Sequence, residues 1–250
     1  MFPPQLLIFE TAAELHHVAA AYWRRLAQEA VEVRGRFLLV LAGGSTPKPL
    51  YRRMAQSPYR EDVPWSQTHV FWGDERMTSP EDPESNYGQA RETLLSQVPV
   101  PPEQVHPVPG KLEPEEAALA YGETLARWAR AGRSWPRFDL VLLGLGSDGH
   151  TASLFPGSTG GEEEGVPARA VHAEYGDRPA DRVTLTPPVF NSARQIFFLV
   201  TGEEKAEAVA GVLDGEYDPG RWPAQRIRPE DGRVSWLVDR AAATQLVDEF

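Results

Sequence analysis

A histidine and an aspartate lie two residues apart in the glycine-rich segment 144–158, which reads GLGSDGHTASLFPGS. The apolar run Phe138–Leu143, broken only by Asp139, precedes this segment and predicts a buried strand. Glycines let a backbone turn sharply and approach a ligand closely, and open α/β sheets bind ligands at the carboxyl ends of their strands. His150 is therefore the first catalytic candidate, with Asp148 beside it. The alternative is a strand-to-helix turn in which the histidine only caps a helix.

A second glycine-rich turn follows the apolar run Phe37–Ala42 and consists of Gly43, Gly44, Ser45 and Thr46. Pro47 suits the first position of a helix, so the turn lies between a buried strand and a helix N-terminus. Free N–H groups, the positive end of the helix dipole and two hydroxyls suit a phosphate. The spacing matches neither a P-loop nor a dinucleotide-binding fingerprint. The alternative is a simple N-cap by Ser45 or Thr46.

Three consecutive charges, from Asp74 to Arg76, follow the apolar strand predicted at His69–Trp72. Arg76 could hold an oxyanion or a carboxylate through charge-assisted hydrogen bonds, and Asp74 could orient a sugar hydroxyl. The alternative is a solvated turn with a local salt bridge. Arg182 begins another predicted strand and Lys205 begins a helix, so each could supply positive charge to a phosphate or could be an ordinary surface residue.

The elements that must position these side chains alternate between strands and helices, which predicts a mostly parallel sheet in an α/β fold. A helix begins at Thr11, with Glu14 completing a capping box, and ends at Gly35. Asp239 is expected to cap a final helix. An acidic loop is expected at 157–165. The expected strands are Leu6–Phe9, Phe37–Ala42, His69–Trp72, Phe138–Leu143, Arg169–Ala173, Arg182–Leu185, Gln195–Thr201 and Val234–Val238; further helices are expected near 47–55, 86–97, 113–130 and 205–213.

Bulk composition excludes several classes of protein. The chain has 250 residues, no cysteine and a formal net charge of −11, which argues against a nucleic-acid partner but leaves a small anionic substrate open. Without cysteine there is no disulfide and no thiol nucleophile. The histidines lack metal-ligand spacing, so we expect no metal, and no serine lies in a GxSxG elbow. We see no signal peptide and no apolar run long enough for a membrane span.

Six segments together resemble the 6-phosphogluconolactonase family of the soluble α/β type. The wider superfamily includes glucosamine-6-phosphate deaminase, which shares the GGST, GDER and DGH motifs. The segments occur in the order typical of the family: 41–51 (LAGGSTPKPLY), 71–76 (FWGDER), 85–88 (SNYG), 144–158, 182–186 (RVTLT) and 202–206 (GEEKA).

The resemblance implies hydrolysis of 6-phospho-D-glucono-1,5-lactone to 6-phospho-D-gluconate, in the oxidative pentose phosphate pathway. It implies a single Rossmann-like, doubly wound domain over residues 1–250, with helices on both faces of the sheet and no cofactor. His150 corresponds to the general base, and Asp148 belongs to the same motif. Asp74 and Arg76 correspond to the lactone site. The expected phosphate contacts are Gly44, Ser45, Thr46, Arg182 and Lys205, next to Gly43 in the same turn.

Two other functions stay open. In the deaminases, the DGH motif is followed by a run that ends in Asn-Glu-Pro, whose glutamate works with the histidine. Here Phe155 precedes Pro156, which favours the lactonase. The other open function, besides the deaminase, is that of a sugar-phosphate sensor without catalysis. We expect a cytoplasmic monomer whose partner is a small phosphorylated molecule.

Overall fold

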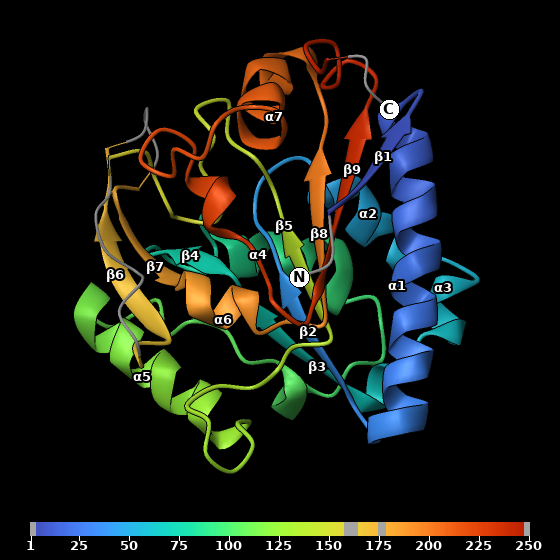
Figure 1. Ribbon diagram of the computed structural model, residues 1–250. Coiled ribbons are helices and arrows are strands. Elements are labelled where there is room, and N and C mark those ends of the chain that lie inside the picture. Colours follow the sequence, from blue (N-terminus) through green and yellow to red (C-terminus); the bar gives the residue numbers. More distant parts are fainter. Residues whose placement is uncertain (1–3, 158–164, 175–178, 248–250) are drawn as a thin grey trace.

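The computed structural model describes residues 4–157, 165–174 and 179–247. Within these residues, six parallel strands form the central sheet in the order β1-β9-β8-β5-β2-β3 (Figure 1). Phe37 of β2 lies opposite Thr68 of β3, and Val141 of β5 lies opposite Ile196 of β8. The strands are β1 (Gln5–Phe9), β2 (Phe37–Leu41), β3 (Thr68–Trp72), β5 (Leu140–Leu143), β8 (Gln195–Val200) and β9 (Arg233–Asp239).

A second sheet lies beside the first and consists, in the described part of the chain, of three antiparallel strands in the order β4-β7-β6. These strands are β4 (Asp74–Arg76), β6 (Ala168–His172) and β7 (Asp181–Leu185). A solvated turn was the alternative considered for Asp74–Arg76, and that alternative was wrong. Their buried backbone groups need hydrogen-bond partners, and β7 supplies them by antiparallel pairing.

Helices cover both faces of the central sheet, as expected for a doubly wound α/β fold (Figure 1). On one face, α1, α2 and α3 pack on residues such as Leu39; on the other, α5, α6 and α7 pack on residues such as Val40. The helices are α1 (Ala12–Arg34), α2 (Pro47–Met54), α3 (Tyr59–Asp62), α4 (Asn86–Ala90), α5 (Pro114–Arg127), α6 (Pro187–Asn191) and α7 (Ala206–Leu213), with a π turn at Arg91–Leu95 and 3₁₀ turns at Trp65–Gln67, Pro102–Gln104, Glu203–Lys205 and Pro223–Arg226.

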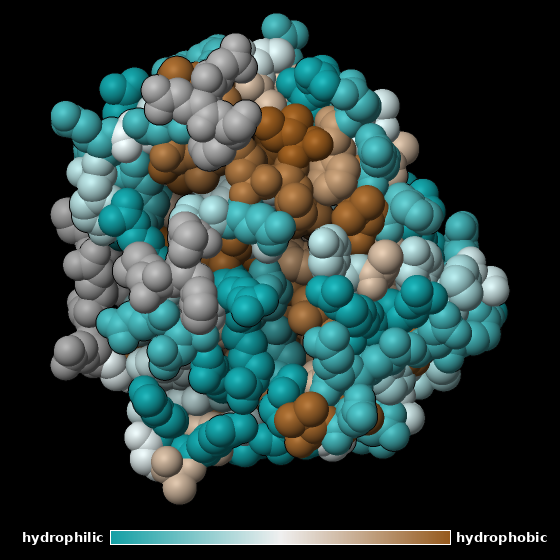
Figure 2. Space-filling model, turned by 45° about the vertical axis from the view of Figure 1, so that its right-hand side comes forward, coloured by the Kyte–Doolittle hydropathy of each residue, from teal (hydrophilic) through white to brown (hydrophobic). Residues whose placement is uncertain are grey.

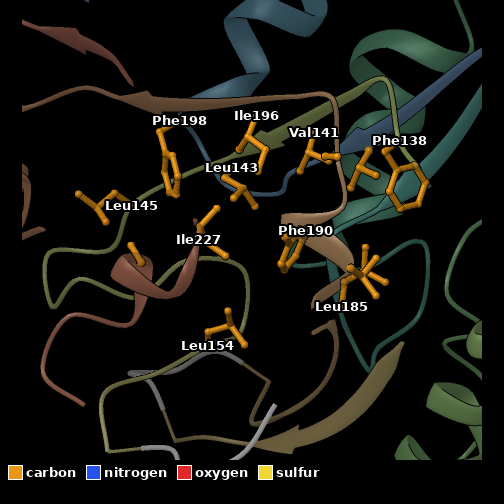
Figure 3. Packing of buried hydrophobic residues seen from close by; sticks show 14 of the residues in the cluster. Phe138, Val141, Leu143, Leu145, Leu154, Leu185, Phe190, Ile196, Phe198 and Ile227 are labelled. Atoms are coloured by element: carbon orange, nitrogen blue, oxygen red, sulfur yellow. The ribbon is translucent and has the colours of Figure 1, made fainter. Parts of the chain in front are cut away.

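The apolar core on the α5 side joins the two sheets. Figure 3 shows Val141 and Leu143 of β5, with Phe198 of β8, turned toward Phe190 of α6 and Leu185 of β7. All five side chains are at most 1% exposed, and burying a side chain of this size contributes about 1.5–3 kcal/mol. The surface in Figure 2 is largely hydrophilic, with apolar residues gathered in its upper half. None of the described helices is long and apolar enough to cross a membrane.

The capping signals of the first helix are confirmed, and the final helix is not. Thr11 accepts a hydrogen bond from the Glu14 N–H (3.2 Å), and Gly35 ends α1 with a φ of 72°. Residues 240–246 form turns instead of a helix. Asp239 caps only one turn, by accepting from the Ala242 N–H (2.9 Å). Most of the acidic loop expected at 157–165 lies outside the described residues.

The order of the strands reverses between β2 and β5. The chain passes from β2 outward to the edge strand β3 and then returns to the other side of β2 as β5. Such a reversal leaves a crevice at the carboxyl ends of the two neighbouring strands, where open α/β sheets bind ligands. The turns that begin at Gly43 and at Gly144 both lie at this point.

Two buried tyrosines hold the strand ends next to this crevice. The Tyr51 hydroxyl, from α2, donates to the Ala42 carbonyl (2.7 Å) and accepts from the Ala42 N–H (3.0 Å). The Tyr121 hydroxyl, from α5, makes the same pair of bonds with Trp72, at 2.9 and 2.8 Å. Burial raises the pKa of both phenols, so both stay protonated. Each tyrosine thus satisfies a backbone N–H and a C=O just where a strand ends.

We predict that Tyr51→Phe lowers the free energy of unfolding by about 2 kcal/mol or more, because it leaves both backbone groups of Ala42 buried without their partner. Urea denaturation of wild type and variant measures this difference. Tyr22→Phe is the matched control, because the half-buried Tyr22 hydroxyl makes no hydrogen bond with a described residue. Equal losses in the two variants would contradict the proposed role of the Tyr51 hydroxyl.

Candidate active site

A cavity of about 330 Å³ occupies the crevice at the carboxyl ends of β2, β3 and β5. Nine of the ten residues expected at the site line this cavity: Gly43, Gly44, Ser45, Thr46, Asp74, Arg76, His150, Arg182 and Lys205. The tenth, Asp148, contacts His150 directly. These residues come from five separate segments, so the fold brings together side chains that are as many as 162 positions apart.

The turn after β2 is shaped for close approach to a ligand. Gly44 has a φ of 95°, a conformation that favours glycine, and a Cβ atom at Gly43 would overlap the Asn86 side chain. The Thr46 carbonyl lies 2.8 Å from the ring Nε2 of His16, and this contact holds the turn against α1. Thr46 is helical and makes no side-chain cap bond, so the simple N-cap alternative does not describe this turn.

His150 and Asp148 form a close pair at the end of β5. The His150 Nδ1 lies 2.6 Å from the Asp148 Oδ1, and the His150 N–H donates to the same oxygen (3.2 Å). Partial burial alone would raise the pKa of Asp148, but the hydrogen bond and charge of the His150 ring outweigh it and lower the pKa. An aspartate at Nδ1 places the proton of the neutral ring there and makes Nε2 the basic nitrogen.

A glycine at position 146 gives this pair its space, because a Cβ atom there would overlap the His150 ring and the Asp148 carboxylate. Phe155 packs on the other side of the pair, with its ring centroid 4.8 Å from that of His150. The Arg182 guanidinium lies 5.4 Å from the centroid of the same Phe155 ring. Phe155 therefore lies between the imidazole and a cation.

Three cations and one carboxylate line the cavity within the described residues: Arg76, Arg182, Lys205 and Asp74. Arg76 and Arg182 lie directly opposite each other in the antiparallel pair β4–β7. The Arg76 Nη1 donates to the Glu84 carboxylate (2.9 Å) and carbonyl (2.7 Å), while its buried Nε has no hydrogen-bond partner among the described residues. The expected local salt bridge of Arg76 thus exists, yet the group still faces the cavity. The surplus of positive charge suits an anion.

Asp74 is held in place by two side chains that the sequence reasoning did not select. Ser153 Oγ donates to its Oδ2 (2.7 Å), and Asn86 Nδ2 donates to its carbonyl (2.9 Å). Asn86 also lines the cavity, and its buried Oδ1 has no partner among the described residues. Asn86 lies in the SNYG segment, one of the six that resemble the family, and this membership was the sequence signal that could have identified it. Ser153 and Phe155 follow His150 closely, but residue type alone did not distinguish them.

Glu75, between Asp74 and Arg76, points away from the ligand space and fixes α4. Its carboxylate accepts from the backbone N–H groups of Asn86 and Tyr87, each at 2.7 Å, at the start of that helix. Burial raises its pKa to about 7 against these hydrogen bonds. Of these three charged residues, Asp74 and Arg76 therefore line the cavity, and Glu75 positions Asn86.

Among the described residues, no group of three or more metal-ligating side chains exists.

Comparison with known proteins places this arrangement in a family. A 6-phosphogluconolactonase from Synechocystis sp. is 40% identical over 231 residues, covering 87% of this chain and 88% of that protein. One from Haemophilus influenzae is 38% identical, covering 82% of this chain and 86% of that protein. The solved structure of 6-phosphogluconolactonase from Trypanosoma brucei superposes with a TM-score of 0.85 at 33% identity, over 99% of this chain and 100% of that one.

A monomeric glucosamine-6-phosphate deaminase also superposes, with a TM-score of 0.82, over 96% of this chain and 99% of that one. Its 21% identity shows a shared fold and nothing finer. A sequence model of one family, described as glucosamine-6-phosphate isomerases/6-phosphogluconolactonase, matches residues 10–236. This chain therefore belongs to the glucosamine-6-phosphate isomerase/6-phosphogluconolactonase family.

Proposed function

We propose that this chain hydrolyses 6-phospho-D-glucono-1,5-lactone to 6-phospho-D-gluconate, in the oxidative branch of the pentose phosphate pathway. The relatives that are 38–40% identical over most of their length carry this activity in their names. The observation that carries the proposal is a single cavity in which the His150–Asp148 pair shares walls with a glycine-rich turn and three cations. A sugar phosphate has a dianion and an electrophilic carbon, and this cavity offers a group for each.

The phosphate is held at the start of α2. Gly44, Ser45 and Thr46 line the cavity at the N-terminus of α2, the positive end of its dipole, where backbone N–H groups can bind an anion, and Lys205 and Arg182 add charge. Lys205 makes no ion pair with a described residue, so its ammonium is available to a ligand. Binding energy from the phosphate then positions the lactone carbon, which does not itself touch these groups.

The chemical step is water attack on the lactone carbonyl. His150 Nε2 takes a proton from water as its oxygen bonds to the carbonyl carbon, and Asp148 at Nδ1 stabilises the imidazolium that forms. Arg76 or an N–H of the 144–149 turn stabilises the oxyanion, a contribution of about 3 kcal/mol for one such donor. The C–O bond to the ring oxygen then breaks, and the imidazolium returns its proton to that oxygen. Asp148 is in this account a positioning residue.

The deaminase alternative is weaker at this site. Its motif has a glutamate directly before a proline, whereas here Phe155 precedes Pro156 and packs on both His150 and Arg182. A sensor without turnover would need the phosphate-binding turn at residues 43–46, but it would not need an aspartate 2.6 Å from the imidazole Nδ1. Both alternatives have distinct outcomes in assays: ammonia release from glucosamine 6-phosphate, or binding without product.

We also propose that the chain acts as one domain over residues 1–250, as a monomer in the cytoplasm. The cores on the two faces share one central sheet, which supports a single domain. The absence of cysteine is compatible with a reducing compartment.

We predict that His150→Ala lowers kcat for the phosphorylated lactone by about 10² or more, because general-base catalysis typically contributes that much. The assay generates the lactone in situ and follows acid release above the spontaneous rate, in buffer with EDTA. His17→Ala, an exposed histidine on α1, is the matched control. A near-normal kcat in folded His150→Ala would remove His150 from the role of base, and dependence on an added metal would contradict the cofactor-free mechanism.

We predict that Lys205→Ala raises KM by about tenfold or more and changes kcat little, because it removes a charged phosphate contact worth about 1.5–3 kcal/mol. Steady-state kinetics with the phosphorylated lactone measure both constants. Lys111→Ala removes an exposed lysine elsewhere and should leave them unchanged. If wild-type protein handled gluconolactone without phosphate equally well, the assignment of the phosphate turn would be wrong.

A further inference from the structure

A second charged cavity, of about 290 Å³, lies at the amino ends of the central strands, at the lower end of the sheet in Figure 1. The candidate active site lies at the carboxyl ends of the same strands, and the two cavities share no residue. The walls of the second cavity come from the end of α1, the start of β2, the segment after α5 and the residues just before β5 and β8. The lining residues are Val33, Arg34, Arg36, Leu38, Trp128, Arg130, Arg137, Asp139 and Arg194.

Five arginines and one carboxylate line this cavity within the described part of the chain. The carboxylate, Asp139, is 5% exposed, and its Oδ2 accepts from the Leu38 N–H (2.8 Å). Its Oδ1 lies 2.9 Å from the Nε of Arg34 and 3.2 Å from the Nε of Arg194. One oxygen atom thus serves two guanidinium groups.

The other three arginines have no carboxylate partner in the described residues. Arg137 Nη2 donates to the Asp231 carbonyl (2.9 Å), a neutral acceptor. The Arg36 guanidinium lies 5.5 Å from the centroid of the Trp128 ring, and Arg130 is exposed at the rim. Four formal positive charges therefore remain uncompensated around one cavity, in a chain whose net charge is −11.

The repulsion among these groups is visible at Arg194. Burial lowers its pKa, and the charges of Arg34 and Arg137 lower it further. Like charges that a fold holds close together raise the free energy of the folded state unless an anion compensates them. An adjoining hollow of about 410 Å³ shares Arg130 and Arg137 and is also lined by Arg133, Arg228, Glu230 and Asp231, so its surplus is two positive charges, against four in the cavity of 290 Å³.

We propose that this arginine-lined cavity binds a small anion that carries at least two phosphate groups. Guanidinium groups match phosphate oxygens in a planar, bidentate geometry, and four surplus charges exceed what one phosphate dianion neutralises. The volume is close to that of the candidate active site, so a molecule of metabolite size fits. Trp128 and Leu38 supply an apolar wall for the remainder of such a ligand. This inference does not rest on the proposed lactonase activity.

Calorimetric titration with inorganic pyrophosphate tests the proposal. All titrations use Lys205→Ala protein at low ionic strength, so that the candidate active site lacks one of its phosphate contacts. The test variant adds Arg130→Gln and Arg137→Gln, two side chains at the rim that leave the Asp139 ion pairs intact. The matched control adds Arg25→Gln and Arg60→Gln, which remove the same charge from exposed positions on α1 and α3.

We expect pyrophosphate to bind Lys205→Ala protein and the control, and to bind the Arg130→Gln/Arg137→Gln variant at least about tenfold more weakly. Orthophosphate should bind at least about tenfold more weakly than pyrophosphate. Equal pyrophosphate affinity in test and control variants, no binding to Lys205→Ala protein, or equal affinity for the two anions would each overturn the proposal. Thermal unfolding of each variant without ligand confirms that the titrated protein is folded.

Discussion

The site depends on one constraint: neighbouring parallel strands end together, and the backbone groups left unpaired at their ends must find partners. At β2 and β3, buried tyrosine hydroxyls provide them for Ala42 and Trp72. Where the strand order reverses, between β2 and β5, the turns stay open, and glycines keep their backbones accessible to a ligand. The reversal of strand order therefore creates the crevice, the tyrosines hold the strand ends beside it, and side chains from distant segments complete it.

The local charge around the two cavities is opposite in sign to the net charge of the chain. The protein is strongly acidic, yet cations collect at both ends of the central sheet. At the carboxyl end, Arg76 and Arg182 lie side by side on the small antiparallel sheet, which gives that sheet a function beyond packing. At the amino end, one buried aspartate holds two of five arginines. Such local fields attract small anions regardless of net charge.

Much of this was predictable from the sequence, because apolar runs and glycine turns reflect local physics. The expected strands lie where the patterns indicated, and nine of ten expected site residues line one cavity. The antiparallel role of residues 74–76 was not predictable, since pairing with β7 is a long-range contact without a local pattern. Asn86 and Ser153 were missed for the same reason: each acts on Asp74, which only folding brings close. The expected final helix did not form although Asp239 does cap the first turn, so a capping residue alone was not a sufficient signal.

The central claim is that a phosphate-binding turn and the His150 imidazole lie across one cavity and act on opposite ends of one sugar. A crystal structure with 6-phosphogluconate bound tests it most directly. The account predicts the phosphate at the N–H groups of Ser45 and Thr46, near Lys205, with the carboxylate carbon beside His150 Nε2. A product bound in the reverse direction, or in another part of the molecule, would contradict it.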